Sequence, residues 1–259
     1  FALQNVAITV GTFAGGVLPA LLLRAGFGNV ARNRTSLLIG VAISALGLLP
    51  LLLIAQRSRR AGHEPTGALL GPQLNATPRR VRRAVWGFAG AAVLLSIGAG
   101  AFIPFVNVYL VRLGASESAV GTILALTGAA GAILSLVAPA LLNRLGSLPS
   151  VLVLRVLPAP VGLLLALFPS LGLVVGTQAV RGIGASMAWP VEMTIFNKRV
   201  PAHAMASAFG LRIAAWNFSW AATSIIAGEL IIHGGYNAPL YILAVFTTLG
   251  TGLLWYALR

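Results

Sequence analysis

The chain has 259 residues, of which 58% are hydrophobic and only 8% are charged, and its net charge is +14. A soluble domain has about 25% charged residues, so this composition excludes a soluble globular protein and indicates a protein surrounded by lipid. The positive charge does not indicate a nucleic-acid partner, because that would need a basic face on a soluble module. Cysteine is absent, which excludes disulfides and cysteine metal sites.

The apolar segments predict an all-α membrane protein with eight transmembrane helices, because a bilayer crossing takes about 20 mainly apolar residues. In chain order the predicted helices cover about 2–23, 35–55, 86–110, 118–141, 150–168, 172–196, 205–230 and 239–257. Short turn-like segments join most of them. One long segment, residues 56–85, is polar and rich in Gly, Pro and Arg. We interpret it as a linker between two membrane bundles.

Lysine and arginine predict the orientation of these helices, since cytoplasmic loops carry an excess of both. If the N-terminus is cytoplasmic, four other segments also lie on the cytoplasmic side. They are the linker, the loop near Arg144, the loop near Arg199 and the C-terminal tail. These segments hold most of the basic loop residues. The sequence therefore predicts a multi-pass protein of the cell membrane with both termini in the cytoplasm.

A weak internal repeat relates the first predicted helix to the seventh. The segment "FALQNVAITVGTFA" from Phe1 aligns with "FGLRIAAWNFSWAA" from Phe209. One predicted helix follows each copy, before the linker in one case and before the end of the chain in the other. Two predicted helices precede the linker and six follow it. If these two parts of the chain are equivalent, four helices are missing on the N-terminal side.

This arrangement resembles the major facilitator superfamily of transporters, whose members have two six-helix halves joined by a long cytoplasmic loop. The segment "PALLNRLGS" is similar to the signature of that family, Gly-x-x-x-Asp-Arg-x-Gly. Arg144 and Gly146 match it, Asn143 stands in place of the Asp, and Pro139 stands in place of the Gly.

The resemblance implies that the chain covers helices five to twelve of a helical bundle of this type. Residues 1–55 would be the end of the N-terminal bundle, with two helices. Residues 56–85 would be the cytoplasmic linker, and residues 86–259 would be the C-terminal six-helix bundle.

Narrow polar stripes run along three predicted helices, where lipid disfavours them and a water-filled cavity accommodates them. Transporters bind substrate near the midplane of the membrane, on such faces. The candidate substrate-cavity residues are Asn107, Gln178, Arg181, Arg212, Trp216 and Trp220. A structural role is the alternative for the main candidates. The arginines would pair with other helices or act in gating, the tryptophans would pack, and the asparagine would bond to a neighbouring helix.

Glu192 lies near the cytoplasmic end of its predicted helix, at the depth of a gate. In the sugar-porter branch of the superfamily, a glutamate and an arginine at the spacing of Glu192 and Arg199 pair with the arginine of the signature loop. The resemblance therefore implies a cytoplasmic gate made of Arg144, Glu192 and Arg199. The alternative is a fixed ion pair at a helix end. Pro190 allows a bend nearby.

The resemblance implies a secondary active transporter, a permease or efflux protein that moves a small-molecule substrate across the lipid bilayer by alternating access. Proton coupling follows only from the resemblance. The arginines favour an anionic or neutral polar solute over a cation, although the aromatic residues equally suit an amphipathic molecule. The alternatives are an integral-membrane enzyme, whose acid–base groups would have to cluster, and a non-transporting receptor or assembly protein. We expect no catalytic residues, no metal site, no cofactor and no nucleic-acid partner, and a monomer at full length.

Overall fold

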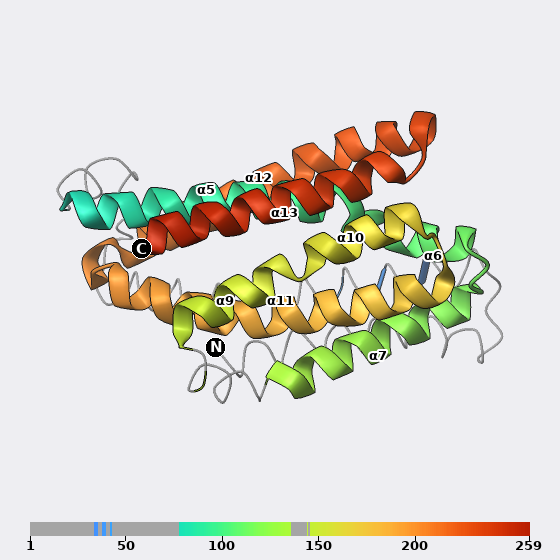
Figure 1. Ribbon diagram of the computed structural model, residues 1–259, viewed down its shortest axis with the longest axis horizontal. Coiled ribbons are helices and arrows are strands. Elements are labelled where there is room, and N and C mark those ends of the chain that lie inside the picture. Colours follow the sequence, from blue (N-terminus) through green and yellow to red (C-terminus); the bar gives the residue numbers. More distant parts are fainter. Residues whose placement is uncertain (1–33, 36–37, 40–41, 43–77, 136–143, 145) are drawn as a thin grey trace.

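The computed structural model describes residues 34–35, 38–39, 42, 78–135, 144 and 146–259, and the elements in these ranges are helices (Figure 1). They are α5 (Arg79–Phe102), η1 (Ile103–Phe105), α6 (Val106–Arg112), α7 (Glu117–Ser135), α9 (Ser147–Val156), α10 (Pro158–Leu167), α11 (Leu171–Arg199), α12 (Ala202–Gly234) and α13 (Asn237–Leu258). Among the described residues, three segments are by themselves long and apolar enough to cross a bilayer, namely Arg79–Arg112, Leu148–Leu167 and Asn237–Ala257.

The predicted all-α membrane fold is confirmed, and each apolar run after residue 86 corresponds to helical structure. The first of these helices begins at Arg79, inside the segment predicted as linker. Pro78 precedes it with an extended backbone, ψ 147°, as expected before a helix start. The predicted helix 2–23, most of the predicted helix 35–55, most of the linker and the last residues of the predicted helix 118–141 lie outside the described residues.

The helices pack in two groups, which Figure 1 shows as an upper and a lower layer. In one group α5 lies against α12 and α13. In the other group α11 lies against α7 and α9. Contacts of α9 and α10 with α13 join the two groups into one bundle.

Glycines allow the closest helix contacts in the bundle. A Cβ atom on Gly100 of α5 would lie 3.0 Å from the backbone oxygen of Trp220 in α12. A Cβ atom on Gly184 of α11 would lie 2.9 Å from the backbone oxygen of Leu154 in α9. Close backbone approach through small residues is how helices associate in lipid, where the hydrophobic effect gives little drive.

Two buried clusters lie at opposite ends of the bundle. The basic-end core contains Phe88 and Phe196, whose rings meet edge to face at 5.0 Å. The tyrosine-end core contains Phe102, Tyr109 and Tyr236, and the two tyrosine rings are 4.4 Å apart. Burial raises the pKa of Tyr236, which lies in the turn before α13, although nearby Arg112 opposes this effect.

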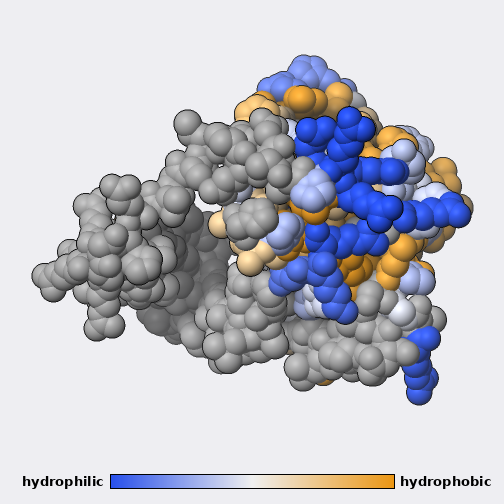
Figure 2. All heavy atoms as spheres, turned by 90° about the vertical axis from the view of Figure 1, so that its left-hand side faces the viewer, coloured by the Kyte–Doolittle hydropathy of each residue, from blue (hydrophilic) through white to orange (hydrophobic). Residues whose placement is uncertain are grey.

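The basic end takes its name from exposed cations where α5 begins and where α11 and α13 end. They are Arg79, Arg80, Arg82, Arg83, Lys198, Arg199 and Arg259. Figure 2 views this end and shows hydrophilic side chains gathered on it. The arginines of α5 lie at a helix N-terminus, where the helix dipole disfavours positive charge, so helix stability does not explain their position.

Two membrane segments are interrupted part-way along. The segment from Arg79 to Arg112 changes to a 3₁₀ turn that contains Pro104. The segment from Ser147 to Leu167 is interrupted at Leu157, between α9 and α10, where Pro158 follows. Proline removes a backbone donor and so favours these breaks. Helix α11, in contrast, continues through Pro190.

Candidate functional site

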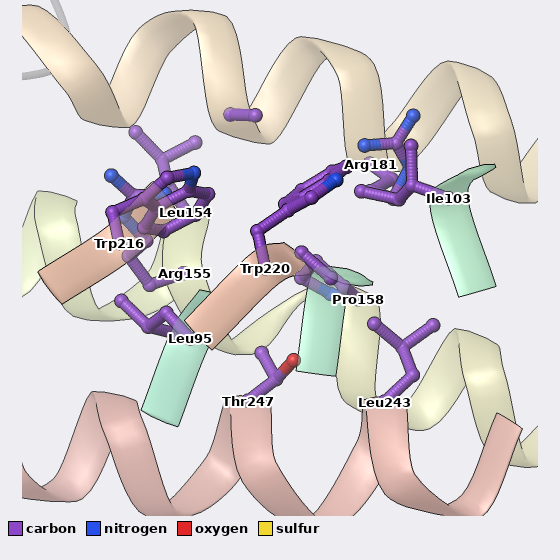
Figure 3. A pocket seen from close by; sticks show the side chains of 12 residues that line it. Leu95, Ile103, Leu154, Arg155, Pro158, Arg181, Trp216, Trp220, Leu243 and Thr247 are labelled. Atoms are coloured by element: carbon purple, nitrogen blue, oxygen red, sulfur yellow. The ribbon is translucent and has the colours of Figure 1, made fainter. Parts of the chain in front are cut away.

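A cavity of about 240 Å³ lies between the two cores. Side chains from α5, η1, α9, α10, α11, α12 and α13 line it (Figure 3). Most of them are apolar. The exceptions are the guanidinium groups of Arg155 and Arg181, the hydroxyl of Thr247 and the indoles of Trp216 and Trp220. The lining therefore combines an apolar wall with a few polar groups, as is usual for small-molecule sites.

Both helix interruptions lie on the wall of this cavity. Ile103 begins the 3₁₀ turn after α5, and Pro158 begins α10, and each lines the cavity. Discontinuous helices at the substrate site are a common feature of secondary transporters, because interrupted backbone is tolerated where it borders a cavity. The breaks and the cavity thus occur at the same level of the bundle.

Trp216 and Trp220 form one side of the cavity from successive turns of α12. Their rings stack with centroids 6.1 Å apart and an angle of 29°. The hydroxyl of Ser96 in α5 donates to the backbone oxygen of Trp216 at 2.6 Å. The hydroxyl of Ser224 donates to the backbone oxygen of Gly100 at 3.2 Å. These bonds hold the tryptophan-bearing turns of α12 against α5.

Arg181 of α11 is half-buried and borders the cavity on another side. Its Nε donates to Oε1 of Gln178 at 2.8 Å, and Gln178 itself is buried. Within the described residues Arg181 has no carboxylate partner. In Figure 3 the side chains of Arg155 and Arg181 lie apart, with Trp220 between them.

Arg155, Glu192 and Arg212 form a buried ionic cluster that joins α9, α11 and α12. Arg155 donates from Nε and Nη2 to Oε2 of Glu192 at 3.0 and 2.5 Å. Arg212 donates from Nη2 to Oε1 of the same carboxylate at 2.5 Å. Glu192 and Arg212 are each only 1% exposed. Charges buried to this degree need partners, because an isolated one costs several kcal/mol of desolvation.

The cluster carries a net positive charge, since two guanidinium groups surround one carboxylate. The guanidinium carbon of Arg212 also lies 4.5 Å from the centre of the Trp189 ring, a cation–π contact. Its Nε is buried and has no hydrogen-bond partner among the described residues. Aromatic contact and the shared carboxylate are therefore what stabilise Arg212.

The structure brings together part of the predicted cavity set. Arg181, Trp216 and Trp220 line the cavity, and Gln178 holds Arg181. Arg212 belongs instead to the ionic cluster. Asn107 is exposed on α6 and is not among the residues that line the cavity.

The predicted gate residues are placed differently from one another. Glu192 is buried and bonds to Arg155 and Arg212, whereas Arg144 and Arg199 are exposed. Most of the signature segment lies outside the described residues, although Gly146 has φ +80°, a conformation that favours glycine. A gate made of Arg144, Glu192 and Arg199 stays a prediction.

Sequence reasoning did not include Arg155 among the candidate site residues. One signal was available. The chain has only four acidic residues, so a deep glutamate indicates nearby cations, and Arg155 is the arginine of the neighbouring helix. Within the described residues no three His, Cys, Asp or Glu side chains form a group that could hold a metal ion.

Comparison with known proteins identifies the family. The family model described as Major Facilitator Superfamily matches residues 88–259. No curated protein and no solved structure gives a significant match. Members of this superfamily are generally transporters rather than enzymes, and they bind small-molecule substrates within the membrane. The match covers more than half of the chain and includes all the described residues that line the cavity, so the protein belongs to the major facilitator superfamily of membrane transporters.

Proposed function

We propose that the protein is a secondary active transporter that moves a small solute by alternating access, and that the cavity between the two cores is its substrate site. The observation that carries this proposal is the position of the cavity. It lies between two closely packed cores, at the level where two membrane segments are interrupted. Substrate sites of secondary transporters lie at this depth.

The basic end of the bundle has features that an alternating-access mechanism needs, namely an ionic cluster beside the cavity and a cytoplasmic orientation. The ionic cluster ties α9, α11 and α12 together beside the cavity. The basic-end cations favour a cytoplasmic location for that end, by the excess of Lys and Arg in cytoplasmic loops. The cluster would then lie between the substrate site and the cytoplasm, where a gate is needed.

A membrane enzyme is less well supported than a transporter. Acid–base catalysis needs groups that can exchange protons close to a bound substrate. In the part of the chain that the structure describes, the cavity lining includes arginines but no carboxylate or histidine. A non-transporting receptor would retain the cavity, so an experiment has to separate that alternative from transport.

Labelling of single cysteines from each side of the membrane tests the proposal without knowledge of the substrate. The natural chain has no cysteine, so it provides a clean background. Ala185 is exposed and lines the cavity one turn from Arg181. In the variant Ala185→Cys, we expect a membrane-impermeant maleimide to react when it is added to either side, because the cavity opens to each side in turn.

Two control variants fix the orientation of the labelling. Arg112→Cys and Arg259→Cys lie at the tyrosine end and the basic end, and each should react from one side only. Reaction of Ala185→Cys from a single side would contradict alternating access and favour a receptor.

A further inference from the structure

We propose that the cavity binds a small organic anion whose single acidic group pairs with Arg181 and whose apolar or aromatic body lies against Trp216 and Trp220. This inference rests on the proposed function, because it names the class of substrate that the same cavity takes. Three observations support it, namely the charge around the cavity, the hydrogen bonds of Arg181 and the apolar lining.

The charge that the described residues place around the cavity disfavours a cationic substrate. Arg155 and Arg181 line the cavity, and Arg212 lies behind Arg155 in the ionic cluster. Glu192 neutralises one of these three cations and leaves an excess of two. Among the described residues that line the cavity there is no carboxylate. Like charges at short range in a medium of low dielectric repel strongly, so an amine would be disfavoured there.

Arg181 is better placed than Arg155 to bind the acidic group. Arg155 already directs Nε and Nη2 to Glu192. Arg181 uses only Nε, which donates to Gln178, and its two terminal nitrogens make no hydrogen bond within the described residues. The bond to Gln178 fixes the plane of the guanidinium group. Two terminal nitrogens held in this way match the two oxygens of a carboxylate.

The rest of the lining favours an organic anion over an inorganic one. Phosphate or sulfate would need several donors to replace its hydration shell, whereas the lining beyond the two arginines is mainly apolar. The two indoles offer flat faces to an apolar body, and aromatic contacts of this kind stabilise a complex beyond the area that they bury. A volume of about 240 Å³ is below the usual range for ligand pockets and favours a small molecule.

Binding of three compounds with the same ring system tests the proposal. The probes are 1-naphthoate, 1-naphthamide and 1-naphthylmethylammonium, which are an anion, a neutral molecule and a cation. Their dissociation constants are measured by calorimetry on the detergent-solubilised full chain at pH 7. We expect naphthoate to bind about tenfold or more tighter than the amide, since one charge-assisted hydrogen bond gives at least this factor. The ammonium compound should bind weakest.

Variants of Arg181 locate the preference for the anion. In Arg181→Gln we expect the preference for naphthoate over naphthamide to disappear, so that the two compounds bind equally. Arg181→Lys keeps the charge and should keep part of the preference, which also covers the case in which the glutamine variant fails to fold. The matched control is Arg112→Gln, an exposed arginine outside the cavity, which should bind like the natural protein.

Three results would overturn the proposal. They are equal binding of the three probes, absence of binding by all of them, and an anion preference that persists in Arg181→Gln. None of these would decide whether the protein transports, because two-sided labelling of Ala185→Cys tests that separately. Conversely, one-sided labelling together with an Arg181-dependent preference for naphthoate would leave an anion-binding receptor.

Discussion

The ionic cluster and the surroundings of Arg181 are two arginine-containing regions next to the same cavity, yet they satisfy their charges differently. Arg212 shares a buried carboxylate with Arg155. Arg181 is half-buried, and among the described residues its side chain donates a hydrogen bond only to the amide oxygen of Gln178. A charge that protein groups neutralise is available to hold helices together. A charge that faces a cavity without a counter-ion is available for a ligand.

Glu192→Gln should give the largest effect, because it removes the carboxylate that both arginines of the cluster share. Breaking a buried ion pair from one side costs about 3–5 kcal/mol. We therefore expect a clear loss of folded protein, measured by thermal unfolding of the detergent-solubilised chain. Glu229→Gln is the matched control, since Glu229 is exposed near the tyrosine end. Similar unfolding temperatures for the two variants would mean that the cluster contributes little to stability.

Gly184→Val should give an intermediate effect. Gly184 lies on α11 between Arg181 and Glu192, and its added side chain would meet the backbone oxygen of Leu154, the residue before Arg155. Separation of α9 from α11 should lengthen the bonds from Arg155 to Glu192 and cost about 1–3 kcal/mol. Thermal unfolding measures the loss.

Gly210→Val is the control for that variant, because a Cβ atom at Gly210 meets nothing within 4 Å. It should unfold near the temperature of the natural protein. Equal loss in both variants would show that valine in a helix, rather than the contact between α9 and α11, is responsible.

Arg181→Gln should give the smallest effect on stability. If Arg181 faces a ligand and has no structural partner beyond Gln178, its removal should change the free energy of unfolding by about 1 kcal/mol, the usual contribution of one hydrogen bond. The measurement is thermal unfolding without added ligand. A loss as large as that of Glu192→Gln would assign Arg181 a structural role and remove the contrast between the two regions.

Much of the fold followed from hydropathy alone. The apolar runs predicted the helices from residue 86 onward, since a bilayer crossing imposes its length on the sequence. The start of α5 at Arg79 was missed, because arginines in the first turns look like linker in a count of apolar residues. Local composition therefore predicts that a helix is present better than it predicts the residues at which the helix begins and ends.

The site was predictable only where one helix determines it. Trp216 and Trp220 share a stripe on α12 and both line the cavity, but Arg212, on the same stripe, bonds to Glu192 and does not line the cavity. Ser96 and Gly100 share a stripe on α5, yet both contact α12. The helical period shows which residues share one face of a helix. It does not show which neighbouring helix packs on that face.

The contact of Glu192 with Arg155 has a consequence for biosynthesis. Glu192 follows Arg155 by 37 residues, and Arg212 follows Glu192 by 20. At about 5–20 residues per second, a ribosome needs about 2–7 seconds to supply the carboxylate after the first arginine. During this interval α9 contains an uncompensated cation, which the insertion machinery disfavours by about 3 kcal/mol at the centre of a helix. Stable release of α9 and α10 into lipid should therefore await the arrival of α11, so that these helices enter the membrane as one unit.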